Sequence, residues 1–253
     1  MLFRSAVHSL KDLPTADTPG LALACVPRRA TPFDALVSRG NTPLASLPSG
    51  AVVGTSSIRR VVQLKALRRD LVIRGIRGNV DTRLRKLDDG EYDAIVLAGA
   101  GLERLGLAGR ITELLRPDAF WPAVAQGALV VQIRDDDAPV REAVMAVDDP
   151  ETHHAVRAER SCLAALAGGC LAPIGGWARM ADGGRLELGC CILEERDDRV
   201  HRIAAAGSID VRSETPEILG RSVATQLGRL GAGAMLETMR KRSEADGPRS
   251  GEG

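Results

Sequence analysis

The stretch Val53-Gly54-Thr55-Ser56-Ser57-Ile58-Arg59-Arg60 has the pattern of a buried strand, a tight turn and the start of a helix. A helix start of this kind presents free backbone N–H groups, and here hydroxyl and guanidinium groups lie beside them. The stretch therefore predicts an α/β unit with an anion site at the turn. The alternative is that Ser56 or Ser57 only caps the helix, while both arginines are solvated.

The same alternation of strand and helix patterns continues on both sides of this stretch. Short apolar runs predict strands, and segments with helical periodicity that follow glycines predict helices between them. Strands that alternate with helices indicate a largely parallel α/β sheet. In such a sheet the turn at 75–79 opens on the same edge as the first turn, so Arg74, Arg77 and Arg83 are expected to face it. The predicted strands are 22–26, 51–53, 71–74 and 93–98, and the helices are 57–69, 79–87 and 102–107.

Positive charge is concentrated in this region. Ten arginines and lysines lie between Gly54 and Leu87 against Asp70 and Asp81, although the whole chain has a net charge of +1. A local excess of this kind indicates a cleft for an anionic ligand. Nucleic acid is a competing ligand, but aromatic residues make up 2% of the chain, too few for a stacking platform, which leaves duplex binding through phosphates as the open alternative.

From residue 150 the pattern changes to that of a small α+β domain. A helix at 151–166 precedes three strands at 174–180, 185–193 and 200–209, and a helix from Glu217 closes the unit. We expect a first domain from 1–27 and 128–146, a second at 28–127 between connectors near 27–32 and 121–125, and a third at 150–242. Residues 243–253, rich in Gly, Ser and charge, are expected to be a disordered tail.

Two further motifs carry reactive groups. In His8-Ser9-Leu10-Lys11-Asp12-Leu13-Pro14, the Asp12 carboxylate could stabilise a developing cation or move protons, although a surface Asp beside a surface Lys is the common alternative. In Gly168-Gly169-Cys170, a thiol lies on a glycine-rich loop, whereas most free cysteines are inert core residues.

The remaining candidates for reactive chemistry are assigned structural roles. We expect Cys162, Cys190 and Cys191 in the core and the pair His153-His154 on the surface, with no metal site. The five cysteines lack CxxC spacing, which favours reduced thiols. Neither a membrane-length apolar run nor a cleavable leader is visible, which predicts a cytoplasmic protein.

Five segments in this order closely resemble the porphobilinogen deaminase (hydroxymethylbilane synthase) family. They are "AVHSLKDLP" from Ala6, "GTSSIRR" from Gly54, "IRGNVDTRLRKLDDGEYDAIVLAGAGLERLGL" from Ile76, "AQGAL" from Ala125 and "ERSCLAALAGGCLAPIGG" from Glu159. The resemblance implies two α/β domains like those of periplasmic binding proteins and a small C-terminal α+β domain with a three-stranded antiparallel sheet. It also implies a dipyrromethane cofactor in thioether linkage to Cys170.

In that family, four porphobilinogens are joined head to tail with loss of ammonia, and water releases hydroxymethylbilane for tetrapyrrole (heme and chlorophyll precursor) biosynthesis. The resemblance places Asp12 at the catalytic carboxylate, beneath a pyrrole N–H that becomes positively charged. It also implies a monomer that binds porphobilinogen and the growing polypyrrole chain, without nucleic acid or membrane. The residues that would bind the acetate and propionate groups are Arg59, Arg60, Arg77, Arg83 and Arg104, with Lys11, Thr55 and Ser57 close by.

The chain departs from the family pattern at its start. Family members begin with a further strand-and-helix segment, whereas here Met1 stands just ahead of the HSLKD run. We therefore expect an incomplete first domain with exposed sheet edges and apolar surface. Two hypotheses follow: a deaminase that carries its cofactor on Cys170, or a truncated relative that binds acidic ligands without turnover.

Overall fold

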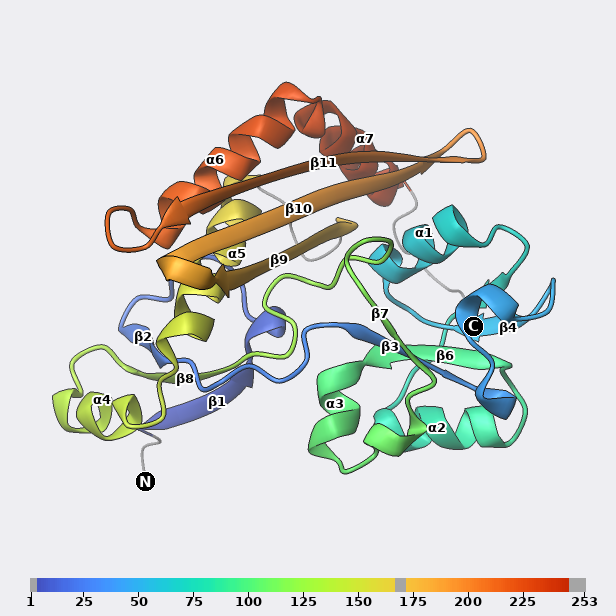
Figure 1. The fold of residues 1–253 in the computed structure, drawn as a ribbon, viewed down its shortest axis with the longest axis horizontal. Coiled ribbons are helices and arrows are strands. Elements are labelled where there is room, and N and C mark those ends of the chain that lie inside the picture. The colour runs from blue at the N-terminus through green and yellow to red at the C-terminus, as the bar shows by residue number, and fades with distance from the viewer. Residues whose placement is uncertain (1–3, 167–171, 246–253) are drawn as a thin grey trace.

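The computed structural model describes residues 4–166 and 172–245, which form three separate sheets (Figure 1). The first sheet is antiparallel throughout, with β8 between β1 and β2. Helix α4 packs on it, and Val140 and Val144 cover a small apolar cluster. The bounds are β1 Ser5–Ser9, β2 Leu21–Cys25, β8 Leu129–Arg134 and α4 Ala138–Met145.

The second sheet has five strands in the order β5-β4-β6-β3-β7. Strands β4, β5, β6 and β7 share one direction, and β3 runs antiparallel to its neighbours β6 and β7. The largely parallel sheet predicted from the alternation is thus confirmed except at β3, which enters from the first connector without a crossover helix before it. The bounds are β3 Asp34–Ser38, β4 Val52–Gly54, β5 Val72–Arg74, β6 Ala94–Ala98 and β7 Glu113–Leu115.

Helices cover both faces of this sheet. Leu64 of α1 packs with Val53 and Val96 on one face, and Leu84 of α2 packs with Ile95 on the other. Helix α2 starts where the Asn79 side chain accepts a hydrogen bond from the Thr82 N–H at 2.9 Å, a normal N-cap. The bounds are α1 Ile58–Leu67, α2 Val80–Asp88 and α3 Gly99–Arg104, with short 3₁₀ turns at Leu10–Asp12, Arg39–Asn41, Leu44–Ser46 and Ala108–Arg110.

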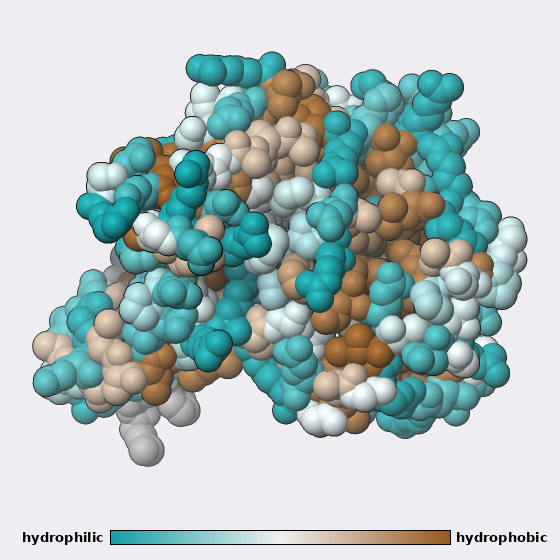
Figure 2. All heavy atoms as spheres, in the orientation of Figure 1, coloured by the Kyte–Doolittle hydropathy of each residue, from teal (hydrophilic) through white to brown (hydrophobic). Residues whose placement is uncertain are grey.

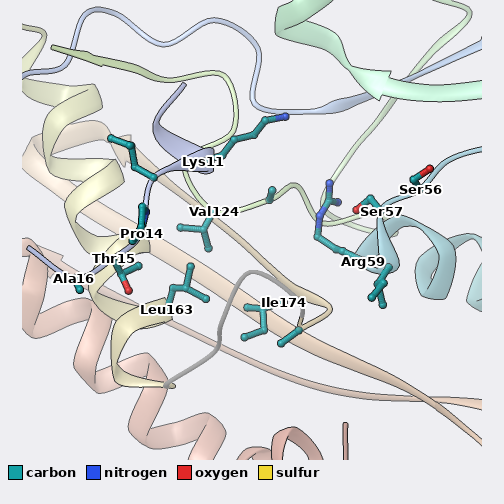
Figure 3. A pocket seen from close by; sticks show the side chains of 14 residues that line it. Lys11, Pro14, Thr15, Ala16, Ser56, Ser57, Arg59, Val124, Leu163 and Ile174 are labelled. Atoms are coloured by element: carbon teal, nitrogen blue, oxygen red, sulfur yellow. The ribbon is translucent and has the colours of Figure 1, made fainter. Parts of the chain in front are cut away.

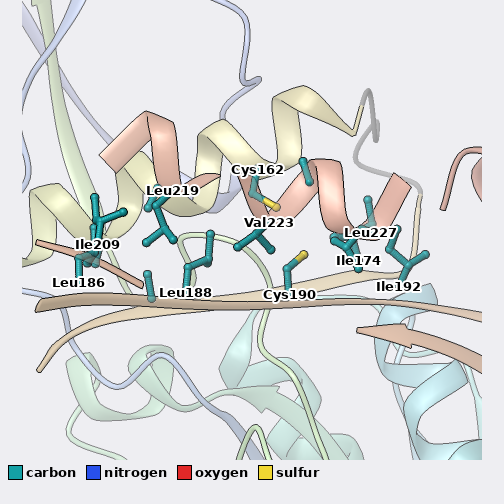
Figure 4. Packing of buried hydrophobic residues seen from close by; sticks show 14 of the residues in the cluster. Cys162, Ile174, Leu186, Leu188, Cys190, Ile192, Ile209, Leu219, Val223 and Leu227 are labelled. Atoms are coloured by element: carbon teal, nitrogen blue, oxygen red, sulfur yellow. The ribbon is translucent and has the colours of Figure 1, made fainter. Parts of the chain in front are cut away.

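The third sheet is antiparallel in the order β11-β10-β9, and its helices lie on one face only. Figure 4 shows alternate residues of β10, such as Leu188 and Cys190, pointing toward Cys162 of α5 and Val223 of α6. The predicted three-stranded antiparallel sheet is confirmed. The bounds are α5 Pro150–Ala165, β9 Ile174–Ala181, β10 Arg185–Arg196, β11 Arg199–Asp210, α6 Pro216–Arg229 and α7 Ala232–Ala245, with a 3₁₀ turn at Asp182–Gly184.

One buried carboxylate ties the three parts together. Glu159 of α5 is fully buried and accepts from both terminal nitrogens of Arg29, at 2.6 and 3.1 Å. It also accepts from the backbone N–H groups of Ala125, at 2.6 Å, and Ala178, at 2.8 Å. Arg29 and Ala125 belong to the two connectors between the first and second sheets, so Glu159 holds both connectors against α5 and β9.

The two connectors also touch each other directly. The Ala30 N–H donates to the Gly127 carbonyl at 3.2 Å. Gly127 has φ +84°, and a Cβ there would lie 2.6 Å from the Thr31 carbonyl oxygen, so no side chain fits this crossing. The connectors near 27–32 and 121–125 that we predicted from proline and apolar content lie at this crossing.

Several elements escape the sequence-based prediction. Strands β1, β3, β7 and β8 and helix α4 are absent from it, because short runs of three to eight residues carry little periodicity. Strand β2 pairs with β8 in the first sheet rather than joining the sheet at 34–115. Helix α7 continues to Ala245, so residues 243–245 are helical rather than part of a disordered tail, and the remainder of that predicted tail lies outside the described residues.

On the face drawn in Figure 2, polar and apolar side chains are interspersed, and no extended apolar patch is visible. In the first sheet both edge strands, β1 and β2, carry an exposed apolar residue, Val7 at 64% and Leu21 at 40%. Within residues 4–166 and 172–245, no helix combines the length and apolar character that a membrane crossing requires.

Candidate active site

Two loops meet at the carboxyl ends of β4 and β5. The strands are parallel, with Gly54 opposite Arg74, and the Thr55 N–H donates to the Arg74 carbonyl at 3.0 Å. The Ser56 hydroxyl donates to the Ile76 carbonyl at 2.8 Å and accepts from the Ile76 N–H at 3.0 Å. The prediction that both turns open on one edge is confirmed, and Ser56 fastens them together.

Helix α1 begins with two arginines that turn inward. Both bind Asp34, a fully buried carboxylate at the start of β3: Arg59 at 2.7 Å and Arg60 at 2.7 Å. The Gln126 amide also donates to Asp34, at 3.1 Å. Burial alone would raise the pKa of Asp34, but the charges of Arg59 and Arg60 and the hydrogen bonds from Arg59 and Gln126 lower it to about 2. The cluster of two guanidiniums and one carboxylate keeps a net charge of +1.

Arg59 also has a partner in the linker before β8. It donates to the carbonyl of Trp121. The Gln63 side chain holds both sides of the same residue, donating to that carbonyl at 3.0 Å and accepting from the Trp121 N–H at 2.6 Å. Arg60 donates to the Val96 carbonyl at 2.9 Å. Both side chains are therefore rigidly held, with 6% and 7% of their surface exposed.

Lys11 approaches the two arginines from the first sheet. It lies on the 3₁₀ turn after β1, anchored by buried Leu10, whose N–H donates to the Ala128 carbonyl at 3.0 Å. Burial lowers the pKa of Lys11, and the charges of Arg60 and Arg59 lower it further, while Asp12 and Asp34 oppose this effect. Figure 3 shows Lys11 and Arg59 extending from opposite sides toward one space.

That space is a cavity of about 410 Å³. Three predicted site residues line it, namely Lys11, Ser57 and Arg59, and its apolar wall includes Leu163 and Ala172. Elements of all three sheets thus meet around one hollow with a cationic side. The full lining is Lys11, Leu13, Pro14, Thr15, Ala16, Ser56, Ser57, Ile58, Arg59, Ala123, Val124, Leu163, Ala172 and Ile174.

The other predicted binding residues lie outside this cavity. Thr55 is buried, and its hydroxyl accepts from the Ser57 N–H at 3.3 Å. Arg83 donates to the Gly78 carbonyl and Arg104 to the Gly127 carbonyl, each at 2.7 Å, and Arg77 is exposed. Asp12 is exposed on the turn that carries Lys11, and Cys170 lies outside the described residues.

The structure gives many residues of the basic cluster at 54–87 partners within the protein. Several of its members serve the fold: besides the pair on Asp34, Lys65 binds Glu195 at 2.7 Å, and Arg68 binds Asp70 at 2.7 Å. Arg74 lies over the ring of Tyr92, 4.6 Å from its centroid. The charge excess read from the sequence is therefore larger than the charge available to a ligand.

The secondary candidates have structural roles, as expected for the cysteines. Cys162, Cys190 and Cys191 are buried. Burial raises the pKa of Cys191 to about 12, so its thiol stays protonated at neutral pH. His153 is half-buried, with its Nδ1 3.0 Å from Asp148. Among the described residues no group of three His, Cys, Asp or Glu side chains could hold a metal ion.

Asp34, Gln126 and Trp121 are site residues that sequence reasoning missed. Asp34 did leave a signal, because an acid that opens the apolar run Ala35-Leu36-Val37 has to be buried with a cation. The identity of that cation was not readable, since Arg59 lies 25 positions away.

Residues 3–142 match the family described as "Porphobilinogen deaminase, dipyromethane cofactor binding domain", and residues 153–229 match "Porphobilinogen deaminase, C-terminal domain". The chain belongs to the porphobilinogen deaminase family. This membership makes it a transferase of tetrapyrrole biosynthesis, a hydroxymethylbilane synthase, and the first match is to the domain that binds the dipyrromethane cofactor.

Individual relatives agree with this assignment. The porphobilinogen deaminase of Roseiflexus sp. (strain RS-1) is 49% identical over 231 residues, which cover 91% of this chain and 74% of the relative. That of Thermus thermophilus is 48% identical over 224 residues, covering 88% and 74%. Among solved structures, YhfZ from Shigella flexneri aligns with a TM-score of 0.25 at 18% identity over 57% of this chain and 60% of its own, too low a likeness to bear on the fold.

Proposed function

We propose that this chain joins four porphobilinogen molecules at the Lys11–Arg59 cavity and holds its dipyrromethane primer through Cys170. The observation that carries the proposal is the convergence of Lys11, Ser57 and Arg59 on one cavity whose wall includes Ala172. Ala172 stands two residues after Cys170 in the chain, so a group attached to that thiol would start near the cavity.

The cavity suits the acidic side chains of pyrroles. Lys11 and Arg59 both reach it, and among the described residues one buried carboxylate, Asp34, pairs with Arg59 and Arg60 beside Lys11. A carboxylate that enters would relieve the repulsion among these cations and accept charge-assisted hydrogen bonds from them. The cavity therefore fits the acetate and propionate groups that both the cofactor and the substrate carry.

We assign the rim of the cleft to the later acids of the growing chain. Arg77, Arg83 and Arg104 lie outside the cavity, and the backbone hydrogen bonds of Arg83 and Arg104 use only part of the five N–H donors that each guanidinium carries. A polypyrrole adds two carboxylates with each unit, so a chain that outgrows the cavity meets these guanidiniums next. Thr55 supports this role indirectly, because its buried hydroxyl orients the Ser57 backbone.

Asp12 is the proposed catalytic residue. It is exposed on a turn whose geometry is fixed by the buried Leu10, and Lys11 next to it lines the cavity. From that position its carboxylate would face the pyrrole nitrogen of the substrate, stabilise the positive charge that develops there, and carry the proton. The dipyrromethane, when bound, supplies the covalent primer to which substrate is added.

The finer sequence predictions stay predictions. They include the three-domain division at 1–27 with 128–146, 28–127 and 150–242, and the likeness of the first two domains to periplasmic binding proteins. They also include a monomeric state, a cytoplasmic location, and the absence of nucleic acid and membrane partners.

The decisive experiment compares Asp12→Ala with Asp17→Ala, a matched change of an exposed acid a few residues further along. Asp12→Ala should reduce turnover of porphobilinogen by about 10²- to 10⁴-fold, as expected for loss of a group that transfers protons, while Asp17→Ala retains it. Intact-mass measurement should find the dipyrromethane still attached in both variants. Turnover within severalfold of the parent chain in Asp12→Ala would remove Asp12 from catalysis.

The attachment site has its own test. Cys170→Ser should lack the added cofactor mass, whereas Cys162→Ser, a change in the apolar core, should retain it. If the parent chain stays unmodified when expressed with a supply of substrate, the alternative is favoured, namely a relative that binds acidic ligands without turnover.

A further inference from the structure

A second cavity, of about 670 Å³, lies on the opposite face of the third sheet from its helices. Leu186, Leu188 and Cys190 of β10 point toward the helices, so Gly189 between them faces the other way. Trp177 is directly opposite Gly189 in the register and shares that face. The linker before β8 supplies the far wall through Trp121.

The lining combines aromatic rings with cations. The chain has two tryptophans, and both line this cavity. The guanidinium of Arg179 lies 5.5 Å from the ring centroid of Trp177, and that of Arg202 lies 5.9 Å from that of Trp121. Such rings offer flat apolar surfaces, and the arginines beside them can hold an acidic group over those surfaces.

The charges leave room for an anion. Two acids, Asp118 and Glu187, line the cavity. Glu187 is paired with Arg179 at 3.0 Å. Arg185 donates to the Ser208 hydroxyl at 2.7 Å, and neither Arg185 nor Arg202 forms an ion pair with an acid in the described part of the chain. The indole N–H of Trp121 is buried and has no acceptor among those residues.

Small residues lie beneath and beside the Trp121 ring. Gly189 and Ala206 are opposite each other in β10 and β11. A Cβ on Gly189 would lie 2.5 Å from Cη2 of Trp121, so the ring rests directly on the strand backbone. Ala206 beside Gly189 carries only a methyl group, so the space next to the Trp121 ring stays open, and we call this space the slot. A planar ring that enters it can stack against the indole, which a branched ligand cannot do.

Trp121 connects this slot with the active site. Its ring lines the slot, while its carbonyl accepts from Arg59, which lines the Lys11–Arg59 cavity. The Gln63 side chain hydrogen-bonds both the N–H and the carbonyl of Trp121. A ligand that shifts the Trp121 ring would therefore act on the hydrogen bond that orients Arg59.

We propose that the slot is a second binding site, for a planar aromatic carboxylate, and that its occupant changes substrate binding through Trp121 and Arg59. The binding half is independent of the function proposed for the chain. The coupling half rests on that function, because its readout is turnover of porphobilinogen.

The binding test follows the two indole N–H signals of the ¹⁵N-labelled full-length chain by NMR, assigned with Trp177→Phe. The probes are naphthalene-2-carboxylate, its neutral analogue naphthalene-2-methanol, and the non-planar cyclohexanecarboxylate. Saturable shifts of the Trp177 signal are expected with the first probe. The neutral analogue should bind at least about tenfold more weakly, since a charge-assisted hydrogen bond is worth about a factor of ten. Cyclohexanecarboxylate keeps the charge and should bind more weakly because it cannot stack flat against an indole. Trp177 is the decisive reporter because it does not line the Lys11–Arg59 cavity.

Variants locate the site. The double variant Arg185→Ala with Arg202→Ala should weaken the binding of naphthalene-2-carboxylate by about tenfold or more. Ala206→Leu, which fills the space beside Trp121, should abolish its binding. Arg229→Ala, an exposed arginine of α6 outside the slot, serves as the matched control and should bind normally. An unshifted Trp177 signal, or equal affinity in all of these variants, would overturn the proposal.

Turnover tests the coupling. Saturating naphthalene-2-carboxylate should change the KM for porphobilinogen severalfold in the parent chain and leave it unchanged in Ala206→Leu. A Trp177 shift with no change in KM would refute the coupling, and an equal change in both proteins would place the effect at the active site instead. If no turnover is obtained from the parent chain, the function proposal fails, and the NMR titration still decides whether the slot binds.

Discussion

Replacing Asp34 by asparagine tests whether the active-site arginines depend on one buried charge. Asp34 is fully buried, and Arg59 and Arg60 each bind one of its oxygens at 2.7 Å. Asparagine has nearly the same shape, so the change removes the negative charge with little loss of packing. It leaves two adjacent guanidinium groups buried without their counter-ion.

The size of the effect follows from the burial. The pKa of Asp34 falls from 3.8 to about 2, which corresponds to about 2 kcal/mol of folding free energy at neutral pH. Removing the partner of a buried ion pair costs more than this, about 3–5 kcal/mol, because the remaining charges stay desolvated. We therefore expect Asp34→Asn to lower the free energy of unfolding by about 3–5 kcal/mol.

Urea denaturation of the two proteins at pH 7 measures this loss. Asp70→Asn is the matched control, because the pKa of Asp70 is also lowered to about 2, by its hydrogen bond from Arg68, yet this pair lies at the surface, with Asp70 exposed and Arg68 half-buried. Water screens the charges of an exposed pair, so Asp70→Asn should change stability little. Equal losses in the two variants would refute the argument that burial, rather than the pKa shift itself, sets the cost.

The pH dependence gives a second check with a definite sign. A carboxylate with a lowered pKa in the folded state stabilises the fold above its unfolded pKa, and this stabilisation is lost as the pH falls through the folded pKa. For Asp34 that window runs from about 4 down to about 2. The stability gap between the parent chain and Asp34→Asn should therefore narrow below pH 4, and a gap that stays constant would contradict the assignment.

Three further substitutions test the framework around the site by urea denaturation. Glu159→Gln should cost about 3–5 kcal/mol, since it leaves Arg29 buried without its partner, whereas Glu217→Gln, which breaks the partly exposed pair with Arg157, should cost far less. Gly189→Ala should cost about 1–3 kcal/mol because its methyl group meets Trp121, and Gly228→Ala in α6, with open space around it, should not destabilise. Asn79→Ala removes the cap of α2 and should cost about 1 kcal/mol, whereas a loss below 0.3 kcal/mol would show that the cap is not used.

Local signals account for the elements that were predicted correctly. Helices α1, α2 and α5 and strands β9, β10 and β11 lie within a few residues of their predicted bounds, because periodicity, caps and turn residues act over neighbouring positions. The meeting of the loops after β4 and β5 was also predictable, since crossover helices impose parallel strands whose carboxyl ends share an edge. The order of the motifs was sufficient to indicate the family.

The sequence by itself thus determined most of the helices, the third sheet, the family and many of the residues from which a site could be built. Tertiary structure alone decided which of those residues are available to a ligand. It directs Arg59 and Arg60 to Asp34 and brings Lys11 to the far side of the cavity. It also pairs β2 with β8, although every strand of the second sheet lies between them in the sequence. The reason is physical. A buried charge must be paired with an opposite charge, and which distant residue provides it depends on how the sheets pack. The sequence of a single segment does not contain that information.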